Sequence, residues 1–209
     1  MDIQDIFSID ISQYVTEEHF QAGETIIREG DVIHFFAVIT KGKAKCCITQ
    51  ENGKVGLVDL LIAPCTLGDL ELLGVQKYGS GIIAITDCIC QMINLDTCNE
   101  MILEDNYFLR YLSTALAKRT IKHARYISMA QTYPLRNRLI TFLLKTQYNG
   151  IYTGTLTEAA SYLGVSYRHL LFVLAQLVKE ELLKKENGMY LISNVEELEK
   201  EEIIVVDEF

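Results

Sequence analysis

A single segment, residues 155–175, constrains the local fold strongly because each of its helix ends and turns carries a separate signal. Thr155 and Glu158 have the spacing of a capping box, in which each side chain accepts a hydrogen bond from a free backbone N–H at a helix start. Gly164 stands where a helix end needs a left-handed residue, and Ser166 can cap a second helix. The small and apolar positions suit two helices that cross at a steep angle: Ala159, Ala160, Leu163, Val165, Leu170, Val173 and Leu174. The pattern predicts a helix-turn-helix.

A hairpin is predicted directly after the second of these helices. Residues 182–192 read as two short strands around Asn187-Gly188, a dipeptide that favours a tight two-residue turn. A hairpin in this position is a wing, so residues 134–195 are predicted to form a winged helix-turn-helix. The alternative interpretation is an unrelated helical hairpin in a small core.

The distribution of charge decides how the acidic composition is interpreted. The whole chain has a formal net charge of −9, which by itself argues against nucleic acid as a partner. Residues 134–194 nevertheless carry seven Lys and Arg against four Asp and Glu, a net charge of +3. Residues 1–133 and 195–209 are each at −6. The only net-positive block is therefore the one that holds the helix-turn-helix.

In a helix-turn-helix the start of the second helix enters the major groove of DNA. Arg168 could then donate two hydrogen bonds to guanine, and Phe172 offers an apolar surface to a thymine methyl group. Ser166 and the wing lysines could hold phosphates. The predicted DNA-binding residues are Ser166, Tyr167, Arg168, His169, Phe172, Lys184 and Lys185. The alternatives are that Phe172 packs within its own domain and that His169 is only a solvated helix residue.

Residues 20–97 are rich in short β-branched and apolar runs separated by Gly-containing turns, as in 34–40, 55–60 and 82–86. Strands at this regular spacing predict an all-β sandwich or barrel. Asn52-Gly53 is expected to form a type I′ turn, which needs a positive φ at both central residues.

From about residue 99 to 131 the apolar period becomes helical. Two neighbouring faces share these positions: Leu112, Leu116, Thr120, His123, Ile127 and Ala130, beside Tyr107, Phe108, Tyr111 and Ala115. One face can pack on the β-domain and the other on the same helix of a second chain; the alternative is a helix packed within one monomer. Pro134 suits the first position of the next helix, 134–148, and makes residues 131–133 a candidate hinge.

The six cysteines and four histidines point to no catalytic or metal chemistry. The start of the chain lacks the pattern of a signal peptide, so we expect a cytoplasmic protein whose thiols stay reduced in a β-rich core. A redox or metal role for Cys46, Cys47 and Cys88 is the alternative. The histidines are scattered without metal-ligand spacing, which disfavours a cupin-like enzyme. Since no P-loop, Rossmann fingerprint or nucleophile elbow occurs either, we predict no catalytic residue and no metal site.

The order of a β-domain, a long helix and a winged helix-turn-helix resembles the cyclic-AMP receptor protein/FNR (CRP/FNR) family of bacterial transcription regulators. The resemblance covers about residues 20–194, with local marks at 22–24, 28–31, 38–42 and 67–72. It implies an α+β fold with a β-roll sensor domain (1–98), a dimerisation helix and hinge (99–133), the DNA-binding domain (134–195) and an acidic tail (196–209). It also implies a homodimer that binds a palindromic double-stranded operator and acts with RNA polymerase, away from membranes.

The resemblance fails at the effector. In the family's cyclic-nucleotide binders the phosphate cassette reads Gly-Glu-Leu … Arg-Ser/Thr, and the Arg holds the cyclic phosphate. Here the cassette reads Gly68-Asp69-Leu70 … Gly79-Ser80, and the long-helix Thr-Ser pair is replaced by His123-Ala124. The implied effector pocket is thus Gly68, Asp69, Leu70, Gly79, Ser80 and His123, with cyclic AMP not expected to bind. Residues 1–45 lack the cysteines that hold the FNR iron–sulfur cluster, and the sequence identifies no cofactor.

A second hypothesis comes from a different functional class. The chain could be a small-molecule sensor that acts through a protein partner and has a weak or decayed DNA-binding domain. The acidic run at residues 196–202 could then serve as the interface, or could equally be a solvated C-terminus. Sequence-specific binding to duplex DNA would distinguish the two hypotheses.

Overall fold

The computed structural model describes residues 1–203 and divides into two compact units. The first unit is Met1–Lys122 and the second begins at His123, so the division falls inside helix α3 (Asn106–Thr132). The sequence predicts boundaries after residues 98 and 133, and this division falls between them. The reason for the difference is that the first half of α3 packs on the β-domain, while its last turns pack on the helices that follow.

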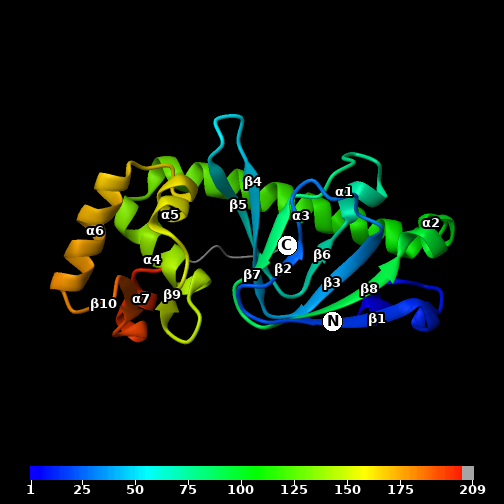
Figure 1. Ribbon diagram of the computed structural model, residues 1–209, viewed down its shortest axis with the longest axis horizontal. Helices are drawn as coiled ribbons and strands as arrows, with labels where there is room; N and C mark the ends of the chain where they lie inside the picture. The colour runs from blue at the N-terminus through cyan, green and yellow to red at the C-terminus, as the bar shows by residue number, and fades with distance from the viewer. Residues whose placement is uncertain (204–209) are drawn as a thin grey trace. The chain divides into compact units, whose positions relative to one another are not determined.

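Two four-stranded antiparallel sheets form the β-roll of the first unit (Figure 1). One has the order β1-β8-β3-β6 and the other β2-β7-β4-β5. The strands are β1 (Val15–Phe20), β2 (Thr25–Ile27), β3 (Phe35–Lys41), β4 (Lys43–Thr49), β5 (Val55–Ile62), β6 (Cys65–Leu67), β7 (Gly81–Ala84) and β8 (Cys88–Asn94). The predicted N-terminal β-roll is confirmed.

The β-roll has two apolar clusters. The first lies between the sheets, where Ile39 and Leu67 of one sheet meet Ile82 of the other. The second joins the chain start to α3 through three rings: Phe7 stacks on Phe108 at 4.4 Å between centroids, and Phe36 meets Phe108 edge-on at 5.2 Å. This second cluster attaches the beginning of α3 to β3.

Short helices complete the first unit: η1 (Ile3–Ile6), η2 (Ser12–Tyr14), α1 (Asp69–Leu72) and α2 (Leu95–Leu103). Buried Asp105 caps the start of α3, because its Oδ1 accepts hydrogen bonds from the backbone N–H groups of Tyr107 and Phe108. Its other oxygen accepts from the backbone N–H of Ser8 at 2.7 Å. Burial by itself raises the pKa of Asp105, but these hydrogen bonds outweigh it and leave the pKa below its ordinary value.

The second unit is a winged helix-turn-helix. After the last turns of α3 come α4 (Leu135–Thr146), β9 (Ile151–Tyr152), α5 (Leu156–Tyr162), α6 (Tyr167–Lys179), β10 (Leu183–Glu186), β11 (Met189–Ile192) and α7 (Val195–Lys200). The three strands form a sheet of order β10-β11-β9. Pro134 occupies the N-cap position of α4, one residue before the position predicted for it.

The helix-turn-helix forms through the signals read from the sequence. The capping box is present, with both Thr155–Glu158 hydrogen bonds at 3.2 Å. Gly164 has a φ of +65°, and the Ser166 hydroxyl accepts a hydrogen bond from the backbone N–H of His169. The buried packing positions between the helices are Ala159, Ala160, Leu163, Leu170, Val173 and Leu174.

The two Asn-Gly turns behave differently. In the wing, Asn187 and Gly188 both have a positive φ and join β10 to β11 by two residues, as a type I′ turn requires. At residues 52–53 only the glycine has a positive φ, so the predicted type I′ turn is wrong there. The β4–β5 connection instead spans residues 50–54 and closes through a backbone hydrogen bond from Gln50 to Lys54.

The segment predicted as an acidic tail is partly folded. Helix α7 packs on α4, Leu198 is fully buried, and the backbone N–H of Ile203 donates to Thr141 Oγ1 at 2.9 Å. Residues 196–203 therefore belong to the second unit, while 204–209 lie outside the described residues. Within residues 1–203 no helix is both long enough and apolar enough to cross a membrane.

Candidate nucleic-acid interface and buried charge site

The predicted DNA-binding residues at the start of α6 are exposed, and Arg168, His169 and Phe172 have the spacing of one helix face. Ser166, Tyr167, Arg168 and His169 are all exposed at the start of the helix, and Phe172 follows one turn later with 62% of its surface accessible. The opposite face of α6 is buried through Leu170, Val173, Leu174 and Leu177. Phe172 is therefore not a packing residue of its own unit, which removes one of the alternatives raised by the sequence.

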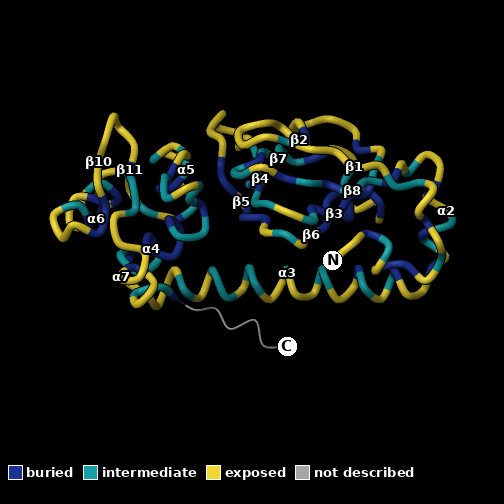
Figure 2. Tube along the Cα trace, turned by 90° about the horizontal axis from the view of Figure 1, so that it is seen from below, coloured by how far each residue is buried: buried dark blue, intermediate teal, exposed yellow. Residues whose placement is uncertain are grey.

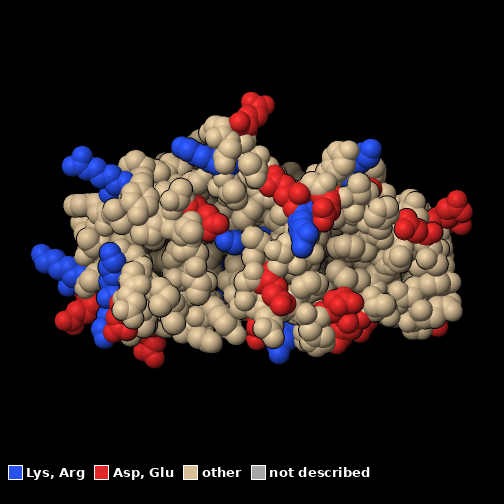
Figure 3. Space-filling model, viewed as in Figure 1, with Lys and Arg blue, Asp and Glu red and all other residues tan. Residues whose placement is uncertain are grey.

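The wing lies beside this helix, because β10 packs against α6. Lys184 and Lys185 are exposed on β10; Lys184 pairs with Glu186, and Lys185 Nζ lies 5.6 Å from the centre of the Tyr190 ring. Figure 3 shows Lys and Arg side chains projecting where Figure 1 places α6 and β10, with acidic side chains toward α7.

Two arginines among the seven basic side chains in residues 134–194, both on α4, are only partly exposed to solvent. Arg136 is half-buried and pairs with Glu180 and Glu201, each at 2.7 Å. The hydrogen bonds from Arg136 lower the pKa of Glu201. Arg138 is half-buried as well and donates to two backbone carbonyls. The freely presented basic surface of this unit is thus smaller than the net charge of residues 134–194 suggests.

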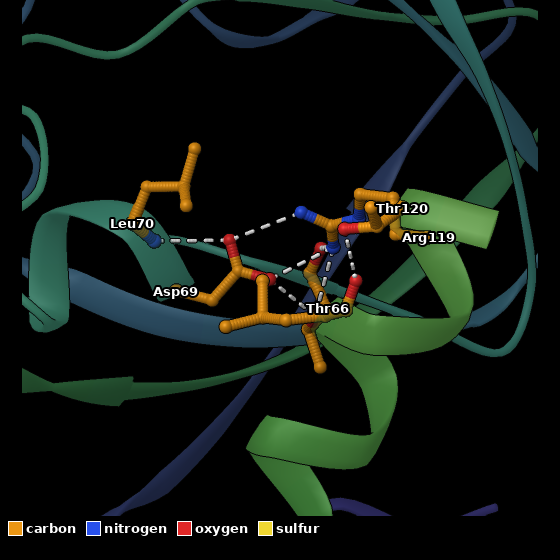
Figure 4. Close-up of polar contacts among 6 residues, drawn as sticks. Thr66, Asp69, Leu70, Arg119 and Thr120 are labelled. Atoms are coloured by element: carbon orange, nitrogen blue, oxygen red, sulfur yellow. Dashed lines mark hydrogen bonds and ion pairs between the residues drawn. The ribbon is translucent and has the colours of Figure 1, made fainter. Parts of the chain in front are cut away.

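The predicted effector pocket is occupied at its centre by a charge network (Figure 4). Asp69 is buried at the start of α1, and Arg119 reaches it from α3 with Nη2···Oδ2 at 2.8 Å and Nη1···Oδ1 at 3.3 Å. The Thr66 hydroxyl donates to the same carboxylate at 2.8 Å, and the backbone N–H of Leu70 donates to Oδ1 at 3.0 Å. The cassette carboxylate is therefore paired by the chain's own arginine.

A side chain at the position that would carry a phosphate-binding arginine would have to displace neighbouring side chains. A Cβ at Gly79 would stand 2.8 Å from side-chain atoms of Ile27 and Ile33. Gly68 is similarly confined, with a φ of +78° and the carbonyl oxygen of Phe35 2.3 Å from where a Cβ would be. Gly68 is thus required by its left-handed φ and by the backbone of Phe35, whereas Gly79 is crowded only by the side chains of Ile27 and Ile33.

The remaining predicted pocket residues are less closely grouped. Ser80 hydrogen-bonds with the Cys46 thiol, which lies within electrostatic range of Arg119. His123 is half-buried on α3 and belongs to the second unit. The structure thus brings Asp69 and Leu70 into one network and places Ser80 beside it.

Sequence reasoning missed a second buried ion pair. Lys122, one turn after Arg119 on α3, donates to Asp59 Oδ1 at 2.8 Å and to the carbonyl of Leu60 at 2.9 Å. Asp59 is buried on β5. The sequence contains an indication of this pair: Asp59 is the only charged residue in the apolar strand 55–62, and Arg119 and Lys122 lie three residues apart on one helix.

Five of the six cysteines lie on strands of the β-roll, and Cys98 lies on α2. Burial raises the pKa of Cys46 to about 11 and that of Cys65 and Cys90 to about 12. Because the thiolate is the reactive form, these side chains are poor nucleophiles at neutral pH. Among residues 1–203, no three His, Cys, Asp or Glu side chains gather closely enough to hold a metal ion.

Comparison with known proteins agrees with this architecture. The cyclic nucleotide-binding domain family matches residues 17–105. The regulatory protein YeiL of Escherichia coli O157:H7 is 36% identical over 195 residues, which are 93% of this chain and 89% of that protein. A protein described as a crp/fnr-family transcriptional regulator from Eubacterium rectale superimposes with a TM-score of 0.72 at 19% identity, covering 91% of each chain. A CRP-family transcriptional regulator from Thermus thermophilus gives a TM-score of 0.68 at 20% identity, covering 88% of this chain and 95% of the other.

Proposed function

This chain belongs to the CRP/FNR family of transcriptional regulators, and from that premise we propose that it binds a palindromic DNA operator as a homodimer. It acts by binding in the cytoplasm, in concert with RNA polymerase, and not by catalysis. The observation that carries the proposal is the exposed face of α6, where Arg168 and Phe172 stand beside each other after a capped helix start. An exposed helix face of this kind can read base edges in the major groove, with arginine at guanine and an apolar group at a thymine methyl.

A second face supports the homodimer. Along α3, the exposed positions directly opposite the buried Phe108 and Leu112 recur at spacings of four and three residues: Arg110, Thr114, Ala117, Ile121, Ala124 and Ser128. Alternating spacings of three and four are the pattern of a coiled-coil seam, and small residues allow two helices to approach closely. Figure 2 shows this exposed side recurring turn after turn along α3.

The charge network supports an effector other than cyclic AMP. Asp69 is already paired with Arg119, and Gly79 stands where an arginine would hold a cyclic phosphate. Calorimetric titration of the full chain with cyclic AMP is expected to give no saturable binding heat.

The DNA-binding proposal is tested by selecting duplexes from a random pool with the full-length protein. We then expect Arg168→Ala to lose about 1–3 kcal/mol of discrimination between the selected duplex and a scrambled one, because a bidentate contact to guanine is removed. Fluorescence anisotropy at a fixed salt concentration measures both affinities. Binding of the wild-type protein should weaken steeply as salt rises.

Lys179→Ala is the matched control, since it removes one positive charge from the far end of α6. It should leave the ratio of the two affinities unchanged. If no duplex is enriched in the selection, the chain is not a sequence-specific regulator, and the sensor hypothesis replaces this one. An unchanged ratio for Arg168→Ala would instead show that α6 does not read the operator through this residue.

A further inference from the structure

Arg138 makes two contacts that link separate helices of the second unit. From α4, its Nη1 donates to the carbonyl oxygen of Leu163 at 2.7 Å, and its Nε donates to the carbonyl oxygen of Tyr133 at 3.2 Å. Leu163 is the C-cap residue of α5, and Tyr133 directly follows the last residue of α3. One guanidinium group therefore bridges the ends of two helices.

Both acceptors are of a kind that favours a cation. The last carbonyls of a helix have no partner within that helix, and they form the negative end of its dipole. At the end of α5, the turn already satisfies the carbonyls of Ala160 and Ser161 through the backbone N–H groups of Val165 and Gly164. Arg138 supplies the partner for Leu163. Its rigid planar guanidinium fork fixes the directions of both hydrogen bonds, whereas the ammonium of a lysine is a point charge on a flexible stem.

A second contact joins the same elements two helical turns away. Tyr126 of α3 meets the ring of Tyr162 of α5 at 6.3 Å between centroids. Lys145 of α4 lies over the Tyr126 ring at 5.6 Å, and its Nζ donates to the Tyr126 hydroxyl at 3.3 Å. Positions 126 and 133 are seven residues apart at the end of α3, and so are 138 and 145 on α4. The end of α3 and helix α4 therefore meet at two points, and at each point one of them contacts the C-terminal end of α5.

We propose that Arg138 is a positioning residue for operator recognition, holding the end of α3 to the turn that sets the angle of the recognition helix. Leu163 lies four residues before Tyr167, where α6 begins, and only Gly164-Val165-Ser166 separate them. When the end of α3 moves, Arg138 moves the turn before α6 with it. Without this bridge, bending at residues 131–133 would absorb the movement. This inference rests on the proposed function, because it assigns Arg138 a role in orienting the surface that binds DNA.

The test compares full-length Arg138→Met and Arg138→Lys with the wild-type protein. Hydrogen exchange measured by mass spectrometry follows the backbone amides of residues 161–167, and anisotropy follows affinity for the selected and scrambled duplexes. We expect Arg138→Met to speed exchange in this turn about tenfold and to weaken operator binding by a similar factor, the order expected for loss of a hydrogen bond from a charged donor. Affinity for the scrambled duplex should stay within about twofold, and Lys should restore little of either loss because it lacks the fork.

Each other outcome contradicts the proposal. If Arg138→Lys restores operator affinity fully, or if Arg138→Met weakens both duplexes equally and lowers the salt dependence, Arg138 contacts a phosphate. If exchange in the turn is unchanged in both variants, the bridge does not position α6. Should Arg138→Met fail to fold, the Lys variant alone decides, because faster exchange and a lower operator affinity are expected of it too. Should the wild-type protein bind no operator, the exchange measurement still tests the bridge while the proposed function fails.

Discussion

At the scale of single residues, the most consequential feature is that the buried carboxylate of Asp69 forms an ion pair with Arg119 of the same chain. Only 5% of the Asp69 side chain is exposed, and Arg119 is its charged partner. A buried carboxylate that loses its partner is strongly destabilising, since the charge is then left without compensation. Asp69 and Arg119 therefore act as a pair, and neither can be substituted alone without loss.

We predict that Arg119→Met lowers the free energy of unfolding by about 3 kcal/mol, as expected when one member of a buried ion pair is removed. Urea unfolding of the full chain measures it. The double variant with Asp69→Asn should recover part of the loss, because no uncompensated charge is then left buried at this site. Lys118→Met, an exposed position on the same helix, is the control and should change stability by less than about 0.5 kcal/mol. Equal losses at positions 118 and 119 would contradict the pairing argument.

At the scale of elements, helix α7 shows that the acidic C-terminal region is partly folded onto the second unit. The acidic run looked like a solvated segment because charge dominates its composition. Leu198 is nevertheless fully buried where α7 packs on α4, and Glu201 accepts a bidentate contact from Arg136. A single apolar residue and one paired carboxylate are enough to seat a short helix when a neighbouring helix offers the complementary groups.

We predict that Leu198→Ala destabilises the second unit by about 3 kcal/mol, because a buried leucine is replaced by a cavity. Glu196→Ala, at an exposed position two residues earlier, should have almost no effect. Thermal unfolding followed by circular dichroism compares the two variants. A loss of less than about 0.5 kcal/mol for Leu198→Ala would mean that α7 does not pack as described.

At the scale of the whole molecule, the exposed stripe of α3 is the proposed dimer interface. Ile121 has 45% of its surface exposed although it lies in the middle of a long helix between small residues. We predict that Ile121→Asp shifts the protein from dimer to monomer, because a carboxylate in a helix seam would be desolvated beside its symmetry mate. Sedimentation velocity measures the change. Val75→Asp, an equally drastic change at a more exposed position in the first unit, should leave the dimer intact.

The overall charge of −9 belongs to the molecule and not to the proposed DNA-binding surface. Most acids lie in the first unit and in the C-terminal segment, so they should repel DNA that is not docked correctly. Within residues 134–194 several basic side chains are already engaged: Arg136 with two glutamates, Arg138 with two carbonyls and Lys184 with Glu186. Affinity should consequently depend more on α6 than on the net charge of the unit.

The sequence by itself determined the features whose causes are local. The capping box at Thr155, the left-handed Gly164 and the hairpin around Asn187-Gly188 each depend on a few adjacent residues, and all three form as predicted. The same dipeptide at Asn52-Gly53 adopts a longer connection, because the flanking strands set the register there and not the turn.

Only the tertiary structure decided the features that join distant segments. The pairing of Asp69 with Arg119, of Asp59 with Lys122, and the bridge from Arg138 to Leu163 span between 25 and 63 residues of sequence. A charged residue on a helix is compatible with solvent, a ligand or a buried partner, and local pattern does not distinguish these. The distinction depends on which opposite charge or free carbonyl the folded chain brings within hydrogen-bond distance, because burial makes that partner necessary.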